Sequence, residues 1–344
     1  MLAYRDKSRI WQLDLLKLFA CFLVVWGHVI SNPNPNTDNS LWRIIYSFHV
    51  SLFMMISGYF ALSTKETSSY NFFKKKFMQL LYPCFIWGCV SFLFSHGYSL
   101  LKGEIQFLSL KKILSELYWL SDFWFLKSCF ICLILTHLGI RHLKNFTYFS
   151  IATLFISQFI SLYQVPFMYP AFYIGFLIRR QSNLLSSLIK IRHLILLAFI
   201  IMSSCWTKDV WIACHDVPFA IAFNSNSSTI GFLAFRLFRL SIGITGALSF
   251  FLFFVNTKSS LIKSVQAQHL CSYGQYTLEI YVISAVLFGN VKYLLASSST
   301  ISELFNYYIF APFLSSIIII ASVFIAKLLF SNKKTSYFFW GRLR

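Results

Sequence analysis

Two histidines lie within or beside apolar segments, where an ionisable side chain is unusual. His28 is near the end of the run Leu18–Ile30 (LFACFLVVWGHVI), and His49 is near the start of Phe48–Phe60 (FHVSLFMMISGYF). An ionisable group inside a bilayer costs about 3 kcal/mol, so such residues are candidate functional sites. Histidine titrates near neutral pH and therefore suits proton transfer from a hydroxyl group. Both histidines are therefore candidates for proton transfer.

The segment before His28 carries further polar residues on the same predicted helix face. At ~100° per residue, Asp14, Lys17 and Cys21 fall within about 60° of His28. The rise from Lys17 to His28 is about 16 Å at ~1.5 Å per residue. This face therefore has a carboxylate and an ammonium at one end and an imidazole at the other. In the alternative interpretation, Asp14 and Lys17 only pair with each other, and His28 lies among lipid headgroups.

Other charged residues interrupt apolar segments elsewhere. Arg236 and Arg239 share a helix face, so they suit an anionic substrate group; the alternative is that they extend to lipid headgroups. Lys127 follows the apolar sequence FWFL, and Glu279 lies within YGQYTLEIYVIS. Lys76 ends a run of three lysines. Such a run is usually an orientation signal, but it also attracts a phosphorylated cytoplasmic cofactor.

The composition predicts the elements that hold these residues. With 57% hydrophobic and 12% charged residues among 344, the chain is far outside the soluble norm and is an integral membrane protein. We expect an all-α, polytopic fold of about ten transmembrane helices, because a bilayer span needs about 20 apolar residues. The expected spans are 12–31, 43–63, 77–96, 122–138, 146–162, 166–179, 193–207, 231–255, 275–294 and 304–328.

We expect one transmembrane domain over residues 1–344, with no fused soluble domain. The first apolar run has no small-residue cleavage site, so it is predicted to be a retained helix and not a signal peptide. The external loop 97–121 is either an amphipathic surface helix or a plain connector, and a short tail follows Phe330.

The net charge of +19 indicates how the chain is oriented in the membrane, and does not indicate nucleic-acid binding. With the N-terminus inside, the predicted cytoplasmic segments hold 19 Lys and Arg residues and the external segments hold 6. This asymmetry is the positive-inside bias of membrane proteins. An even number of helices then places both termini in the cytoplasm. His28 and His49 share a depth near the external face in this topology, on helices joined by a short loop, so they can meet.

The cysteines do not predict a metal centre. Cys129 and Cys132 form C-x-x-C, but they lie in apolar sequence without a second pair, which favours packing. We expect no structural metal and no disulfide framework. The sequence also lacks a P-loop, a dinucleotide-binding fingerprint, a G-x-S-x-G elbow and an H-E-x-x-H motif.

Several blocks resemble the acyltransferase-3 family of bacterial membrane O-acyltransferases. RIWQLDLLK, followed by Gly27 and His28, is similar to the family's opening, R-x(3–4)-L-D-x-L-R and then a histidine. The segment Phe48–Tyr59 is similar to its F-H-x-P-L-F-x-x-x-S-G-Y block. Further similar blocks are FFKKKFMQLLYP ending in Pro83, Trp124–Lys127 and Gly274–Ser284. The resemblance extends over most of the chain.

Four positions depart from the family pattern. Lys17 replaces an arginine, which keeps the charge but loses the bidentate fork. Lys76 and Gln79 replace arginines in the third-helix block, and Ser284 stands where a histidine is common.

The resemblance implies an enzyme of the bacterial cytoplasmic (inner) membrane. It would move an acyl group, usually acetyl, from cytoplasmic acetyl-CoA to a hydroxyl of an extracytoplasmic glycan such as O-antigen, capsule or exopolysaccharide. Acyl-CoA would be the donor substrate and no cofactor would be bound tightly. The other partners would be membrane lipids and a surface glycan or lipid-linked saccharide as acceptor, with no nucleic acid.

The resemblance and the predicted depths together assign roles to the polar residues. His28 is implied as the catalytic residue, either a general base or a transient acyl carrier, and His49 as its partner. The expected donor-binding residues are Asp14, Lys17 and Lys76. The expected acceptor-binding residues are Ser57, Tyr59, Lys127, Arg236, Arg239 and Glu279. Ser57, Gly58 and Tyr59 would also let the second helix pack closely.

Two other functions stay open at this point. A transporter or flippase for a glycan or lipid intermediate also needs buried charges, although no inverted repeat is visible and the histidines lie near one face. An inactive family member could also act as a structural partner in polysaccharide synthesis.

Overall fold

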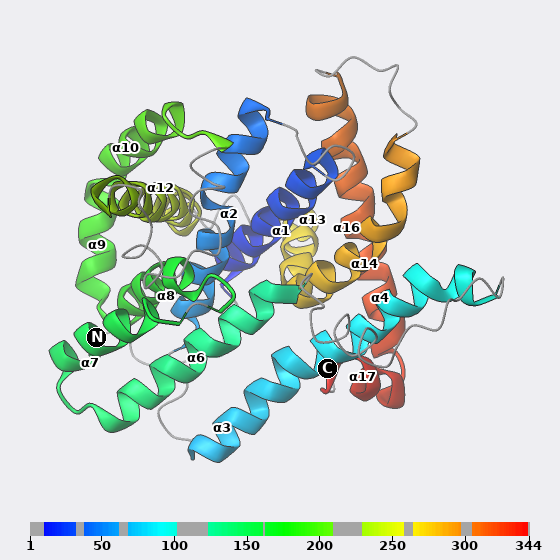
Figure 1. The fold of residues 1–344 in the computed structure, drawn as a ribbon, viewed down its shortest axis with the longest axis horizontal. Coiled ribbons are helices and arrows are strands. Elements are labelled where there is room, and N and C mark those ends of the chain that lie inside the picture. Colours follow the sequence, from blue (N-terminus) through cyan, green and yellow to red (C-terminus); the bar gives the residue numbers. More distant parts are fainter. Residues whose placement is uncertain are drawn as a thin grey trace. The chain divides into compact units, whose positions relative to one another are not determined.

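The computed structural model describes residues 10–31, 38–61, 68–101, 123–160, 162–208, 229–257, 264–296 and 305–342. These ranges contain helices and no strands, as the predicted all-α class requires (Figure 1). Most of the predicted surface helix in 97–121 lies outside the described residues.

Six described helical segments are long and apolar enough to cross a membrane. They are Trp11–Ser31, Ser40–Tyr59, Ser69–Phe94, Trp124–His142, Leu233–Val255 and Asn306–Phe330. The pair Ser182–Lys190 and Arg192–Ser204, bent by 67°, makes a seventh if it is one broken span. The predicted spans 146–162 and 166–179 contain helices of only 12 and 16 residues. A count of ten spans and cytoplasmic termini therefore stay predictions.

The chain divides into two compact units, which we describe separately. Unit 1 consists of Met1–Val24, Asp38–Phe72 and Ile131–Gln275, and unit 2 of Val25–Thr37, Phe73–Phe130 and Tyr276–Arg344. The helices α1 (Trp11–Ser31), α3 (Ser69–Lys76) and α6 (Trp124–His142) contribute residues to both.

Unit 1 is organised around α2 (Ser40–Tyr59), which packs against α8 (Val165–Arg180) and α12 (Thr229–Val255). The contact with α8 relies on two glycines. A Cβ atom on Gly58 would coincide with the carbonyl oxygen of Phe172, and one on Gly175 with that of Met55. The two backbones thus approach closely only because both positions lack a side chain. This confirms the close packing predicted for the segment around Gly58.

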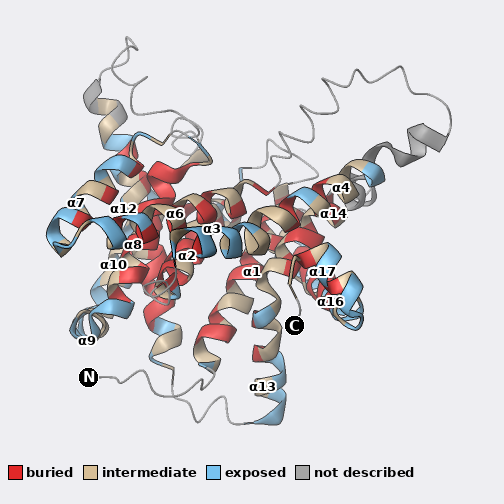
Figure 2. Cartoon of the chain, turned by 90° about the horizontal axis from the view of Figure 1, so that it is seen from below, coloured by how far each residue is buried: buried red, intermediate tan, exposed pale blue. Residues whose placement is uncertain are grey.

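The contacts between α2 and α12 show that these helices run in the same direction. Gly243 of α12 packs on Ser47 and Ser51, and further along both helices the rings of Tyr59 and Phe251 lie 5.5 Å apart. The remaining helices of unit 1 are α7 (Phe146–Ser157), α9 (Ser182–Lys190), α10 (Arg192–Ser204), α13 (Val265–Ser272) and the start of the short η6 (Tyr273–Tyr276). No residue of α9 is buried (Figure 2).

Unit 2 contains α4 (Tyr82–Leu101), α14 (Thr277–Ala296), α16 (Ala311–Phe330) and α17 (Lys333–Trp340). Its hydrophobic core includes Trp87 of α4, Val282 and Ile283 of α14, and Trp340 of α17. The rings of Trp87 and Trp340 lie 5.2 Å apart. Within the short tail predicted after Phe330, these residues form a capped helix with a fully buried tryptophan.

Two short π-helical segments occur in unit 2, η2 (Phe77–Leu81) and η7 (Asn306–Phe310). Each comes just before an X–Pro step, at Pro83 and Pro312. The residue before each proline donates its N–H five residues back, from Tyr82 to Phe77 and from Ala311 to Asn306. Since proline has no N–H, the next carbonyl in each segment has no donor within its helix.

Other parts of unit 2 lie against these two carbonyls. The indole of Trp26 donates to the carbonyl oxygen of Tyr307 at 3.1 Å. Gly341, at φ 62°, lies against the carbonyl of Met78, where a Cβ atom would approach to 2.5 Å. At both proline steps a distant part of the chain thus lies close to the carbonyl.

Candidate active site

Asp14 and Lys17 form an ion pair at 3.2 Å on the first turns of α1. The Lys17 ammonium also lies 4.4 Å from the centre of the Phe60 ring. A Cβ atom on Gly274 would coincide with the carbonyl oxygen of Asp14, so the backbone there is closely packed. Asp14 and Lys17 do pair, as the alternative interpretation of this helix face states. An ammonium has three donors, so one ion pair leaves it able to contact a donor substrate as well.

His49 is 5% exposed on α2, and its ring nitrogen Nδ1 lies 2.7 Å from the carbonyl oxygen of Ile45. A carbonyl can only accept, so Nδ1 must carry the hydrogen in this contact. In a neutral imidazole, Nε2 then carries the lone pair. This is the tautomer that a general base acting through Nε2 requires.

An aromatic row leads along α2 to His49. Trp42 stacks on Tyr46 at 4.3 Å between ring centroids, and the Tyr46 ring meets the His49 ring edge-on at 4.9 Å. The ammonium of Lys208 lies 5.7 Å from the centre of the Trp42 ring. Sequence reasoning missed this row, although the spacing of Trp42, Tyr46 and His49 places them on one helix face.

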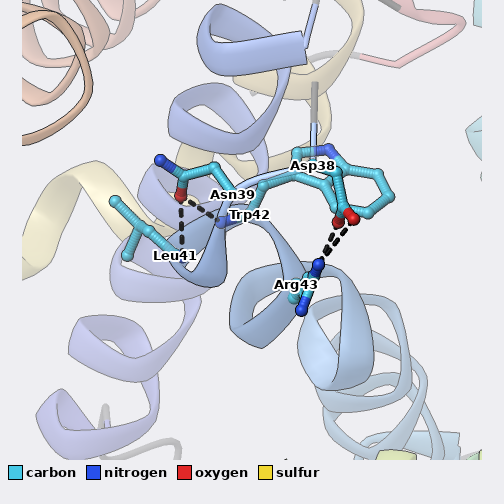
Figure 3. Close-up of polar contacts among 5 residues, drawn as sticks. All are labelled: Asp38, Asn39, Leu41, Trp42 and Arg43. Carbon is cyan, nitrogen blue, oxygen red and sulfur yellow. Dashed lines mark hydrogen bonds and ion pairs between the residues drawn. The ribbon is translucent and has the colours of Figure 1, made fainter. Parts of the chain in front are cut away.

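Local contacts fix the start of α2. Asn39 caps the helix by accepting from the backbone N–H groups of Leu41 and Trp42 at 2.7 and 3.2 Å (Figure 3). Arg43 donates twice to the Asp38 carboxylate, at 2.6 and 2.5 Å (Figure 3). The hydrogen bond from Arg43 holds the pKa of Asp38 below its usual value, although partial burial opposes this shift.

His28 is half-buried near the end of α1 and belongs to unit 2. Its ring lies 5.4 Å from that of Phe288. The neighbouring Trp26 is held by the carbonyl of Tyr307. Because His49 belongs to unit 1, a meeting of the two histidines stays a prediction.

Arg236 and Arg239 are 4% and 9% exposed, so both guanidinium groups are buried. They lie over the same ring, with distances to the Phe167 centroid of 4.9 and 4.1 Å. Arg239 also donates to the side-chain oxygen of Gln164 at 2.6 Å. Arginines that extend to lipid headgroups would be exposed in the isolated protein. The burial counts against the headgroup alternative, and the binding of an anionic group stays a prediction.

Gln164 was not predicted and depends on an unusual backbone. Tyr163 and Gln164 have φ values of 50° and 56°, in the left-handed region that residues other than glycine rarely adopt. Gln164 occupies the N-cap position of α8 but makes no side-chain cap. Its side chain instead contacts Arg239 on α12, a long-range contact that no local sequence pattern indicates.

Ser57 and Tyr59 lie toward the other end of α2. Tyr59 is ten residues beyond His49, a rise of about 15 Å. Arg179 donates to the Tyr59 hydroxyl at 3.4 Å and lies 5.3 Å from its ring centre. Ser57 is half-buried next to Gly58. The structure thus places these two residues apart from His49.

The other predicted residues lie in unit 2. Lys76 is half-buried and donates to Gln79 at 3.4 Å, and Lys127 is half-buried in α6. Glu279 is completely buried and accepts from Arg342 at 2.6 Å. Its contact is therefore with the C-terminal segment, a pairing across 63 residues that the sequence did not indicate.

A family profile and a known protein each match more than half of this chain. The family profile described as "Acyltransferase domain" matches residues 10–331. The chain belongs to the acyltransferase-3 family. It is 31% identical over 213 residues to the nodulation protein NolL of Sinorhizobium fredii (strain NBRC 101917 / NGR234). That match covers 56% of this chain and 54% of NolL, so the chain spans about half the length of this relative. No solved structure matches.

Within the described residues, no group of three or more His, Cys, Asp or Glu side chains is arranged to hold a metal. Cys129 and Cys132 are both buried.

Proposed function

We propose that this chain is an O-acyltransferase of the bacterial cytoplasmic membrane. It moves an acyl group, acetyl in the simplest case, from cytoplasmic acyl-CoA to a hydroxyl of an extracytoplasmic glycan such as O-antigen, capsule or exopolysaccharide. The observation that carries this proposal is His49, a buried imidazole whose Nδ1 contact leaves Nε2 as the basic nitrogen. Membership of an acyltransferase family supports the class of reaction.

The reaction requires removal of one proton and departure of one thiolate. The acceptor hydroxyl oxygen attacks the thioester carbonyl carbon, a C–O bond forms and the C–S bond breaks. The hydroxyl proton passes to a histidine Nε2 and then to the CoA thiolate. We assign His28 as the catalytic histidine, as general base or transient acyl carrier, and His49 as its partner base. A neutral imidazole suits this role at physiological pH.

The donor is assigned to the cationic residues of the inner half. CoA carries phosphate groups, and the ammonium groups of Lys17 and Lys76 provide complementary charge. The Asp14 carboxylate holds the Lys17 side chain in place at 3.2 Å. Acyl-CoA enters as a substrate and leaves as CoA.

The test compares the O-acetyl content of surface polysaccharide from cells carrying wild type, His28→Ala, His49→Ala and His49→Gln at matched expression. We expect a loss of about 10²- to 10⁴-fold in the His28 variant and in both His49 variants. His193→Ala is the matched control, because His193 is an exposed histidine of α10. Undiminished O-acetylation in the His28→Ala cells would refute the mechanism.

A further inference from the structure

The short helix α9 of unit 1 has an apolar side and a polar side, and none of its residues is buried. We infer that α9 lies along the membrane surface and binds the headgroups of anionic phospholipids. Its apolar side enters the lipid, and the cations at its two ends contact the lipid phosphates. The inference concerns how the protein is held in its membrane, and it goes beyond the proposed acyl transfer.

The sequence of α9 divides its residues between two sides of the helix. At ~100° per residue, its aliphatic residues fall within about 140° and its polar residues fall on the remaining arc. The aliphatic residues are Leu184, Leu185, Leu188 and Ile189. All four are half-buried, so the neighbouring helices cover this side only in part. Such a separation of sides, in a helix too short to span a bilayer, is typical of helices at a membrane surface.

The helix after α9 runs along a membrane span. The Phe199 ring of α10 lies 6.4 Å from that of Phe250 in α12. The Trp206 ring follows α10 and lies 6.0 Å from that of Phe238, which comes earlier in α12. The helices α10 and α12 are therefore antiparallel, and α12 contains a segment that is long and apolar enough to cross a membrane.

The direction of α9 differs from that of this span. Its axis is bent by 67° from the axis of α10. The nine residues of α9 are about 14 Å long at ~1.5 Å per residue, and only about 5 Å of that length is directed along α10. The helix α9 thus turns away from the direction in which α10 and α12 cross the membrane.

Three other helices of unit 1 end where α9 is located. Arg179, in the last turn of α8, donates to the hydroxyl of Tyr59, the last residue of α2. The Tyr59 ring lies 5.5 Å from that of Phe251, near the end of α12. Since α9 begins two residues after α8 reaches Arg180, it lies at the end of unit 1 where α2, α8 and α12 finish. Spanning helices end at the bilayer surface, so this is the level of the lipid headgroups.

Four cations flank α9 at this end, namely Arg179, Arg180, Lys190 and Arg192. Arg180 lies 4.2 Å from the centre of the Phe146 ring, and Arg192 donates to the carbonyl oxygen of Ile189 at 3.1 Å. Within the part of the chain that the structure describes, none of the four pairs with a carboxylate. The sequence gives the reason, because residues 123–208 contain no Asp or Glu. The charges at the two ends of α9 therefore suit an anionic partner.

An anionic phospholipid fits both sides of α9. Guanidinium and ammonium groups bind phosphate oxygens, and each cation near an anionic membrane surface strengthens the attraction about fivefold. The apolar side is continuous with α10, whose residues Leu194, Leu197 and Ile201 are 66%, 53% and 59% exposed. Because this apolar surface continues along the direction of the span, lipid is the partner that covers it. A soluble phosphate would satisfy only the charges.

The experiment measures hydrogen–deuterium exchange of α9 in the full chain, reconstituted in nanodiscs of phosphatidylcholine with or without phosphatidylglycerol. We expect phosphatidylglycerol to slow exchange of the α9 amides in wild type about 5- to 100-fold, as one to three cations contact lipid. A triple variant with Arg180→Gln, Lys190→Gln and Arg192→Gln should exchange at the same rate in both bilayers. Glycerol 3-phosphate added to phosphatidylcholine nanodiscs should not slow exchange in wild type.

The matched control carries Lys75→Gln, Lys333→Gln and Lys334→Gln, which remove three exposed cations elsewhere and give the same net charge. It should respond to phosphatidylglycerol as wild type does. Equal exchange of wild-type α9 with and without phosphatidylglycerol would overturn the inference, and this comparison involves no variant that could fail to fold. A response lost in the control, or kept in the triple variant, would also overturn it. Slowing by glycerol 3-phosphate would assign the cations to a soluble phosphate instead. None of these results bears on the proposed acyl transfer.

Discussion

Removing the guanidinium of Arg342 is expected to leave a buried carboxylate without its counter-charge. Glu279 is 0% exposed, whereas the Arg342 side chain is 34% exposed. Breaking a fully buried ion pair by deleting one partner costs about 3–5 kcal/mol. Because solvent reaches Arg342, we expect the smaller cost of about 2 kcal/mol for Arg342→Gln, or roughly a 30-fold change in the unfolding equilibrium constant.

Tryptophan fluorescence during denaturant titration in detergent measures this change. Trp87 and Trp340 belong to the core cluster of unit 2, so their emission follows unfolding of the region that contains the ion pair. Glu279→Gln with Arg342→Gln should be more stable than Arg342→Gln alone, since no buried charge remains. The reasoning is wrong if Arg342→Gln unfolds like wild type. It is also wrong if the losses of unfolding free energy from the two substitutions simply add in the double variant, because the carboxylate then does not depend on Arg342.

Three further predictions concern the donor, the helix contact and pH. Lys17→Ala should raise the KM for acetyl-CoA in transfer assays, whereas Lys17→Arg should keep the wild-type KM. Equal KM values in wild type and both variants would contradict the donor assignment. Gly175→Val should prevent the folded state from accumulating in detergent, because its Cβ would coincide with the carbonyl oxygen of Met55. The Asp38 pKa is lowered by Arg43, so the stability from that pair is present at neutral pH and lost as pH falls below about 4. Asp38→Asn should remove this pH dependence from the free energy of unfolding. If the variant shows the same dependence of unfolding free energy on pH as wild type, the Asp38–Arg43 pair is not its source.

The helical segments and the close packing at Gly58 were predictable because apolar length and glycine position are local properties of the sequence. The same holds for the ion pair of Asp14 and Lys17, which are three residues apart. The contacts of Arg239 with Gln164 and of Glu279 with Arg342 join residues 75 and 63 positions apart. Spacing along one helix carries no information about such partners, because they depend on how separate helices pack.

The character of the C-terminal residues was also not predictable from hydropathy. The sequence predicted only a short tail after Phe330. Its helix is stable because Trp340 enters the core of unit 2 and Arg342 reaches Glu279. Both contacts need partners from other helices. A local signal existed in the Asn332 cap, whose side chain accepts from the backbone of Lys334.

The π segments before Pro83 and Pro312 determine how the helices after them are rotated. A π segment accommodates one residue more than an α-helix of the same rise, so its loss would turn every later residue by about 100° about the axis. For α4, that rotation would carry Trp87 away from Trp340, although neither residue belongs to the π segment. The π segments before the two prolines therefore determine which face of α4 and α16 packs on the core of unit 2.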